Sequence, residues 1–288
     1  MRMGFRLVDV FTERPLAGNQ LCVVPEPPAD LTPDWMQALA REIGFSETTF
    51  VTQASGDRYR MRIFTPGREL PFAGHPTLGT AYVLVSEDRV TTPGVQEVAA
   101  GEVPVEVDVA SEVAWMRQLP ARFGRELADR DRVARAVGFQ PADLDPGLPP
   151  QVVSTGLEQL MVAARSEDEV ARAAVDTRTL TAVVEEAGAD GLYLFAITAD
   201  GAKARYFGPG VGVDEDPATG SAAGPLGAYL AERGAGGMPG RLLIRQGEEL
   251  GRPSLLEVEV MRDGGAWRVR VGGGVRVVGR GEFDLPDA

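Results

Sequence analysis

The chain has 288 residues, of which 44% are hydrophobic, so it can form one large domain or two ordinary ones with a sizeable core. Acidic residues (42) outnumber basic ones (29), and a net charge of −13 argues against nucleic acid or an anionic membrane surface as a partner. One cysteine and one histidine exclude an internal disulfide and the usual Cys/His zinc site. Without a bilayer-length apolar run or a secretory signal, we expect a cytoplasmic protein.

The clearest element of the first third is a helix over residues 33–43. Thr32 can cap it, Pro33 suits the first helical position, apolar residues recur at helical spacing, and Gly44 can end it. The short β-branched stretches on either side of the turn at 54–57 predict a hairpin. Strands are predicted at residues 5–11, 18–24, 47–53, 59–65 and 102–110, and a buried helix at 77–85.

A second half of the chain begins near residue 114. Its helices are predicted around 126–137, 167–187 and 217–233, and its strands at 151–155, 159–164, 191–198 and 202–208, followed by a β meander at 255–261, 266–272 and 275–285. Strands and helices mix without strict βαβ alternation. The fold class predicted is therefore α+β with mixed sheets.

The two halves contain similar stretches about half a chain length apart. RIFTPG at 62–67 matches RYFGPG at 205–210 in four of six positions. Each is followed by a polar loop with a proline and then by a helix rich in glycine and alanine. We infer a duplicated fold, and a cleft between two such domains is where a ligand site is expected.

The first candidate site residue is His75, the only histidine. If Pro76 begins the helix, His75 occupies the N-cap, and the backbone from Gly74 to Thr77 offers N–H groups at the positive end of a helix dipole, which bind carboxylates. The alternative is that His75 is an ordinary residue of a surface turn.

The matching stretch of the second half repeats this arrangement. Asp216 precedes Pro217, and Thr219, Gly220 and Ser221 offer further N–H and hydroxyl donors. The alternative for Asp216 is a purely structural N-cap, for which aspartate is favoured.

Glu47 is the third candidate, with Ser46 beside it. It lies just before a β-branched strand, and an acid at a strand edge facing a cleft can act as general base and then general acid. The alternative is a solvated surface glutamate. Cys22 lies within a strand pattern and is expected to be buried rather than nucleophilic. The glycine-rich stretches GPGVG (208–212) and VGGG (271–274) lack the layout of a dinucleotide or phosphate loop, so nucleotide binding is discarded.

The chain resembles the PhzF-like family of isomerases from phenazine biosynthesis, whose fold is shared with diaminopimelate epimerase. The similarity runs over nearly the whole chain, in the order DVFTERPLAGNQLCVV, IGFSETTFV, RIFTPGRELPFAGHPTLGTA, VSTGLEQLMV, GVDEDPATGSA, QGEELGRPSLLEVEV and VGGGVRVVGRGEF.

The resemblance implies two similar domains, 1–112 and 113–288, with the last strands able to pack back on the first. Each would have a mixed, mostly antiparallel sheet wrapped round a central helix, with the active site in the cleft between them. It also implies a cofactor-free and metal-free enzyme and a homodimer.

Carried over by motif, the resemblance makes Glu47 the acid/base, and His75 and Asp216 polar partners of the substrate. The surrounding substrate-binding residues would be Ser46, Gly74, Pro76, Thr77, Thr219, Gly220 and Ser221. Epimerases of the wider superfamily use two cysteines at the helix N-termini. Here AGHP and PATG occupy those places, which excludes two-thiol epimerisation.

Single-base chemistry is what this residue set allows. Glu47 would remove a proton from an activated carbon and return it further along the same face, and burial would raise its pKa toward the working pH. The substrate expected is a small anionic carboxylic acid with an unsaturated or carbonyl system. Ala223 stands where relatives often have histidine, which argues against the phenazine precursor itself. The alternative function is a non-catalytic binding or regulatory protein that keeps the cleft.

Overall fold

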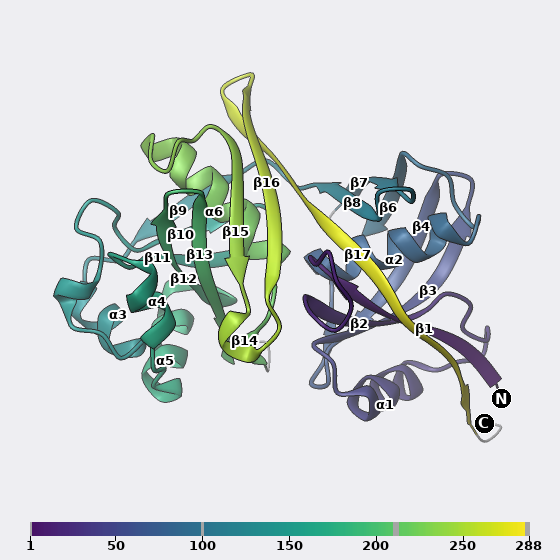
Figure 1. The fold of residues 1–288 in the computed structure, drawn as a ribbon. Helices are drawn as coiled ribbons and strands as arrows, with labels where there is room; N and C mark the ends of the chain where they lie inside the picture. The colour runs from purple at the N-terminus through teal and green to yellow at the C-terminus, as the bar shows by residue number, and fades with distance from the viewer. Residues whose placement is uncertain (1, 99–100, 210–212, 286–288) are drawn as a thin grey trace. The chain divides into compact units, whose positions relative to one another are not determined.

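The computed structural model describes residues 2–98, 101–209 and 213–285 (Figure 1), which form a strand-rich, mixed α/β fold. The chain divides into two compact units. Unit 1 comprises Met1–Arg117 with Gly272–Ala288, and unit 2 comprises Gln118–Val271. The division between Arg117 and Gln118 lies five residues beyond the predicted domain boundary, and the last strand belongs partly to unit 1.

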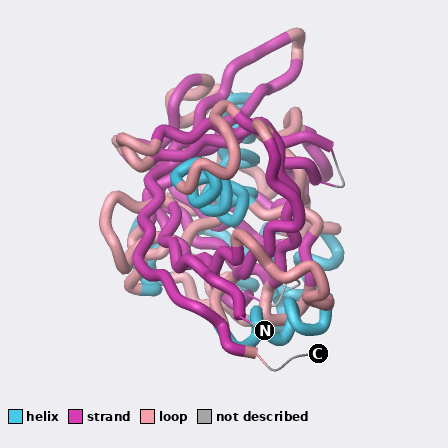
Figure 2. Tube along the Cα trace, turned by 90° about the vertical axis from the view of Figure 1, so that its right-hand side faces the viewer, coloured by secondary structure: helices cyan, strands magenta, loops and turns pink. Residues whose placement is uncertain are grey.

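Unit 1 is a closed ring of strands around one helix, α2 (Gly74–Ser86). Around the ring, successive strands pair in the order β1, β2, β3, β4, β6, β7, β8 and β17, and β17 pairs again with β1. The β2–β3 and β4–β6 pairs are parallel, whereas the pairs β1–β2, β3–β4, β6–β7, β7–β8 and β1–β17 are antiparallel. Figure 2 shows the cyan helix inside the magenta ring. The elements are β1 (Arg2–Val10), β2 (Asn19–Val24), α1 (Pro33–Ile43), β3 (Glu47–Ser55), β4 (Arg58–Phe64), β5 (Glu69–Leu70), β6 (Gly94–Val98), β7 (Gly101–Asp108), β8 (Val113–Arg117) and β17 (Ala266–Asp284).

Unit 2 likewise contains one buried helix, α6 (Gly220–Arg233), packed on its strands. Strands pair in the order β9, β10, β11, β12, β13, β15 and β16, and α6 packs on β10, β11 and β16. The elements are β9 (Arg122–Glu126), α3 (Arg130–Ala136), β10 (Gln151–Ser154), β11 (Glu158–Ala163), α4 (Glu167–Arg172), α5 (Thr177–Ala187), β12 (Gly191–Thr198), β13 (Gly201–Gly208), β14 (Val213–Asp216), β15 (Gly240–Gln246) and β16 (Ser254–Asp263), with 3-10 turns at Pro141–Asp143 and Glu248–Leu250.

The local signals of the first third are confirmed. Helix α1 spans the predicted residues, Thr32 accepts a hydrogen bond from the Trp35 N–H, and Gly44 ends the helix in the left-handed conformation. Strands β3 and β4 form the predicted antiparallel hairpin.

The duplicated RxF stretches form the same local structure in each unit. The Arg62 guanidinium lies 5.1 Å from the ring centroid of Phe64, and that of Arg205 lies 5.0 Å from that of Phe207. Each arginine also binds a glutamate through two nitrogens, Arg62 with Glu69 and Arg205 with Glu215. The repeat therefore encodes a paired cation–π and ion-pair contact. Gly210, the last residue of the second stretch, and residues 211–212 of GPGVG lie outside the described residues.

Two predicted helices of the second half are wrong in extent. Residues 122–126 form strand β9, and a shorter helix follows at α3. The predicted 167–187 helix is two helices, because the Arg205 guanidinium binds the carbonyl oxygens of Val170, Ala171 and Ala173 where α4 ends. Asp176 then caps α5.

The predicted C-terminal meander is also wrong in detail. Residues 266–284 form one strand, β17, that belongs to both units, and a strand missing from the prediction, β15, precedes β16. Glycine permits close packing along β17, since a Cβ atom at Gly272 would lie 2.2 Å from the Trp115 ring. The VGGG stretch thus has a packing role.

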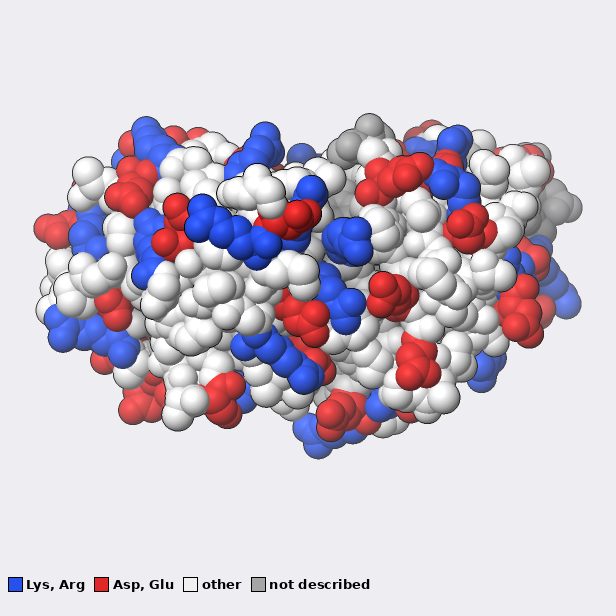
Figure 3. Space-filling view, turned by 90° about the horizontal axis from the view of Figure 1, so that it is seen from above, with Lys and Arg blue, Asp and Glu red and all other residues white. Residues whose placement is uncertain are grey.

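Charged side chains of both signs are interspersed on the face shown in Figure 3. Among the described residues, no helix has the length and apolar character to cross a membrane, and no cluster of three or more His, Cys, Asp or Glu side chains could hold a metal ion.

A glycine on each buried helix permits close contact with the surrounding strands. A Cβ atom at Gly79 would lie 2.7 Å from Leu21 and 2.9 Å from Val10, and one at Gly227 would lie 2.7 Å from Val258 and 2.9 Å from Val260. We therefore expect Gly79→Ala and Gly227→Ala each to lower the free energy of unfolding. Overpacking costs about 1–3 kcal/mol, whereas the better helix propensity of alanine regains roughly 1 kcal/mol.

Urea denaturation measures this change, with Gly67→Ala as the control. Gly67 has no positive φ, and an added Cβ would approach nothing closer than 3.7 Å. Alanine variants at 79 and 227 that are as stable as Gly67→Ala would contradict the packing argument.

Candidate active site

Glu47 is the first residue of β3 and is brought beside β2 by parallel pairing, in register with Leu21. Glu47 is only 9% exposed, so the alternative of a solvated surface glutamate is wrong. Ser46, just before it, is half-buried.

His75 lies in the first turn of α2 and is 4% exposed, so it is not a surface turn residue. The predicted N-cap position is wrong: α2 begins at Gly74, and Ala73 is its N-cap, in extended conformation. The helix starts early because the Thr77 hydroxyl donates to the Ala73 carbonyl oxygen at 2.8 Å and because Pro76 needs no N–H partner in the first turn.

The imidazole of His75 lies between an amide and a carboxylate. Nδ1 is 3.1 Å from Asn19 Nδ2, and Nε2 is 3.3 Å from Glu47 Oε2. Which ring nitrogen carries the proton depends on the tautomer, because Nδ1 contacts the Asn19 amide and the ring also hydrogen-bonds the backbone of Gln20. The fold therefore brings the predicted base and the predicted orienting residue into direct contact.

Burial dominates the protonation of His75. It lowers the pKa of the imidazole from 6.5 to about 3, although a hydrogen bond with the backbone of Gln20 acts in the opposite direction. The nearby carboxylate of Glu47 would also favour the charged ring, yet the cost of desolvation is larger at so buried a position. At neutral pH the ring is a neutral hydrogen-bonding group.

The start of α2 leaves backbone donors available. No side chain caps this helix, and Gly74 and His75 are first-turn residues whose N–H groups have no intrahelical acceptor. The Thr77 hydroxyl, by contrast, is used within the helix, and Pro76 has no N–H to offer. Of the predicted binding residues of this stretch, Gly74 is therefore the one with a suitable donor.

Asp216 belongs to unit 2 and is the last residue of β14, 7% exposed. Its alternative role as an N-cap is wrong, because α6 begins at Gly220 with Thr219 as its N-cap, rather than near 217. The Thr219 hydroxyl donates to Asp216 Oδ2 at 2.5 Å.

The first turn of α6 resembles that of α2. No side chain caps it, and Gly220 and Ser221 carry the first-turn N–H groups. Gln118, the residue that follows β8, donates to the Gly220 carbonyl oxygen at 2.9 Å and so holds this turn. Thr155 in turn donates to Gln118 Oε1 at 2.6 Å.

Four polar residues of these surroundings were missed by the sequence analysis. Asn19 contacts His75, Gln118 holds Gly220, and Gln246 and Tyr193 bind one another beside Asp216. Two of them lie inside motifs that carry the family resemblance, AGNQ and QGEELGRPS, which is the signal that could have found them.

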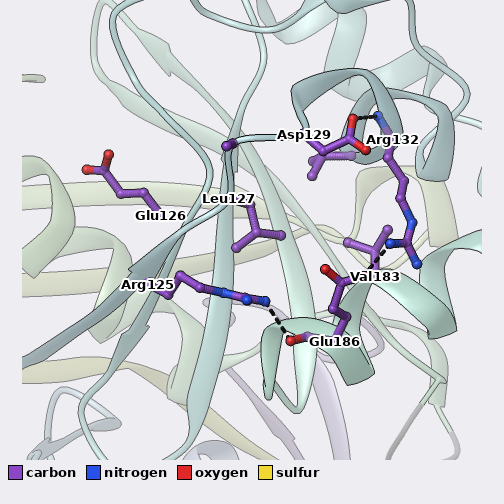
Figure 4. A pocket seen from close by; sticks show the side chains of 9 residues that line it. Arg125, Glu126, Leu127, Asp129, Arg132, Val183 and Glu186 are labelled. Carbon is purple, nitrogen blue, oxygen red and sulfur yellow. Dashed lines mark hydrogen bonds and ion pairs between the residues drawn. The ribbon is translucent and has the colours of Figure 1, made fainter.

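A cavity of about 320 Å³ in unit 2 contains none of the predicted site residues (Figure 4). Arg132 pairs with Glu186, and Arg125 donates to the Glu186 carbonyl oxygen at 2.6 Å. Because its charges are paired near the surface, we assign it no chemistry. It is lined by Arg125, Glu126, Leu127, Ala128, Asp129, Arg132, Val133, Val183 and Glu186. Cys22 is buried as expected, and burial raises the pKa of its thiol to about 12, which makes it unreactive.

Comparison with known proteins defines the class. The family model described as phenazine biosynthesis-like protein (PhzC-PhzF) matches residues 8–281. The trans-2,3-dihydro-3-hydroxyanthranilate isomerase of Pseudomonas fluorescens is 34% identical over 98% of this chain and 99% of its own. A solved structure of a predicted epimerase from Pseudomonas aeruginosa is 36% identical, covers 99% of this chain and 100% of its own, and superposes with a TM-score of 0.88. The chain belongs to the PhzC/PhzF family and is an isomerase.

The fold extends beyond this family. The structure of a probable proline racemase from Agrobacterium radiobacter superposes with a TM-score of 0.71 over 99% of this chain and 93% of its own, at 13% identity. This likeness agrees with an epimerase-like fold and carries no argument about activity.

Because His75 is the only histidine, its protonation can be followed directly. With a pKa near 3, its ring proton signals should stay unshifted between pH 5 and 8 in a ¹H–¹³C NMR titration of the native protein. A midpoint near pH 6.5 in the folded protein would contradict neutrality of the ring.

The lowered pKa of His75 also predicts that the free energy of unfolding depends on pH. The unfolded chain binds a proton at this histidine below about pH 6.5, whereas the folded chain does not until about pH 3. The free energy of unfolding should therefore fall with decreasing pH in this window, by up to about 1.4 kcal/mol per unit from this group. His75→Gln should remove this contribution, which urea denaturation at pH 4.5 and 7 would measure.

Proposed function

We propose that this isomerase moves a proton along a small, unsaturated or carbonyl-activated carboxylic acid, with Glu47 as the base that removes and returns it. His75 and Asp216 orient the substrate, and the backbone N–H groups at the starts of α2 and α6 stabilise the negative charge that develops. The proposal requires the residues of both units to act on one substrate, in the cleft that the family resemblance implies, and it uses no cofactor.

The contact between Glu47 and His75 carries the proposal. A carboxylate and a neutral imidazole meet at 3.3 Å where both side chains are nearly excluded from water. A neutral imidazole beside the carboxylate leaves Glu47 as the group that takes and returns the proton.

The reaction proposed is balanced without a co-reactant. The Glu47 carboxylate takes a proton from the activated carbon, and the electron pair delocalises into the adjacent unsaturated system. The resulting carboxylic acid then delivers the proton to a carbon further along that system and becomes a carboxylate again. A two-thiol mechanism is unavailable, since the one cysteine of the chain is buried in β2.

The substrate proposed carries a carboxylate. The uncapped first turns of α2 and α6 offer backbone N–H groups, from Gly74 and His75 and from Gly220 and Ser221, and a helix N-terminus favours an anion. The compound named for the Pseudomonas fluorescens relative, trans-2,3-dihydro-3-hydroxyanthranilate, is a cyclic unsaturated amino acid of this class. It is the first one to test, and the result also checks the expectation that Ala223 disfavours the phenazine precursor.

Turnover in D2O tests the base. Wild-type protein incubated with that compound should form an isomer visible by ¹H NMR, and Glu47→Gln should lose about 10²–10⁴-fold of the rate while still binding the compound. Glu42→Gln, an exposed glutamate of α1, is the matched control and should keep the wild-type rate. Retention of more than about a tenth of the rate in Glu47→Gln would remove Glu47 from the base role. Bound compound that neither isomerises nor exchanges carbon-bound hydrogen would oppose its use as a substrate.

A substitution in unit 2 tests whether both units serve one substrate. Asp216→Asn keeps the shape and removes the charge, and we expect kcat/KM for the same compound to fall by at least about tenfold, because an ionic partner of the substrate is lost. Asp214→Asn, an exposed position of the same strand, should leave it unchanged. Equal kcat/KM for the Asp216 variant and wild type would separate Asp216 from the reaction.

A further inference from the structure

Gln246 is a buried glutamine, 1% exposed, at the end of β15. Its side chain reaches the segment between β14 and α6. A buried amide is costly unless it is fully hydrogen-bonded, so its partners matter.

All four hydrogen bonds that a glutamine side chain can make are present. Nε2 donates to the Asp216 carbonyl oxygen at 2.7 Å and to Thr219 Oγ1 at 3.0 Å. Oε1 accepts from the Thr219 N–H at 3.2 Å and from the Tyr193 hydroxyl at 2.8 Å. The amide therefore joins the two residues on either side of the turn that leads into α6.

These bonds also set the direction of the Thr219 hydroxyl. Because Oγ1 accepts from Gln246 Nε2, its single proton points to Asp216 Oδ2, 2.5 Å away. A chain of donors runs from Tyr193 to Gln246 and from Gln246 through Thr219 to the carboxylate of Asp216. Each bond in such a chain polarises the next.

The backbone next to Gln246 is held against the same turn. Gly247 has a φ of 77°, and a Cβ atom there would lie 2.5 Å from the Pro217 carbonyl oxygen and 2.4 Å from that of Arg252. Glycine is thus required for β15 to end in contact with the residue that follows Asp216. The start of the QGEELGRPS motif packs on the polar end of α6.

We propose that Gln246 is a positioning residue for Asp216: its two N–H donors hold the backbone of Asp216 and orient the Thr219 hydroxyl onto the Asp216 carboxylate. This inference rests on the proposed function, in which Asp216 orients the substrate. It gives the first residue of the QGEELGRPS motif a role in positioning the Asp216 carboxylate, in addition to holding the turn before α6.

Two substitutions separate the donors from the acceptor. Gln246→Glu keeps the shape and the acceptor for Tyr193 and Thr219 but removes both donors when it is ionised. Once protonated, the introduced carboxyl regains one O–H donor. Gln246→Met keeps a similar volume and has no hydrogen-bond donor at any pH. If the glutamate variant fails to fold, this variant still tests the loss of both donors.

The measurement is kcat for trans-2,3-dihydro-3-hydroxyanthranilate at pH 8 and pH 5.5, relative to wild type at the same pH. We expect Gln246→Glu to be about 10²-fold slower at pH 8, as for a misplacement of about 1 Å, and to recover at least about tenfold at pH 5.5. Gln246→Met should be slow at both pH values. A merely structural role would lower stability without this recovery.

Gln151→Glu is the matched control. Gln151 is another buried glutamine of unit 2, 8% exposed, which donates to the Gly124 carbonyl oxygen at 3.0 Å in strands β9 and β10. Its variant should keep kcat within about twofold of wild type at both pH values. Tyr193→Phe removes one hydrogen bond to Oε1 and leaves both donors of Gln246, so it should lower kcat by less than about threefold.

A Gln246→Glu variant with kcat within about threefold of wild type at pH 8, or with the same relative loss at both pH values, would overturn the positioning role. If wild type itself does not isomerise the compound, the proposed function fails for that compound. Crystal structures of Gln246→Glu at both pH values then decide the inference separately. It is overturned if the Asp216 carboxylate keeps its wild-type position at pH 8.

Discussion

The close packing of one helix inside each unit is the constraint on which the rest of the structure depends. Helices α2 and α6 are buried almost over their whole length, and Gly79 and Gly227 let strands approach their backbones. A helix surrounded in this way has a fixed axis. Its first turn therefore presents its N–H groups in one direction, and the side chains near it occupy fixed positions.

Burial also explains the chemistry available to unit 1. A histidine in water would titrate near neutrality, but His75 is excluded from solvent and stays neutral at physiological pH. It then lies 3.3 Å from Glu47 as a neutral ring that does not compete as a base. The proposed isomerisation by one carboxylate uses such a division of roles.

The polar side chains near the buried helix are positioned differently in the two units. In unit 1 the histidine is on the helix itself, and Asn19 on a neighbouring strand contacts it. In unit 2 the acid precedes the helix, and a glutamine from the end of β15 spans the turn to reach it. The duplicated RxF contacts are nevertheless the same in both units.

The sequence by itself determined the elements whose signals are local. Thr32, Pro33 and Gly44 delimit α1, alternating residues mark the β3–β4 hairpin, and the repeated RxF stretches indicate the duplication, because capping, turn chemistry and side-chain periodicity depend on near neighbours. Motif resemblance added Glu47, His75 and Asp216 as candidates. Only the tertiary structure decided where α2 and α6 begin, why the 167–187 segment breaks and which residues hold the candidates. Arg205, Asn19 and Gln246 reach their partners from strands distant in the chain, so local patterns carry no information about those contacts.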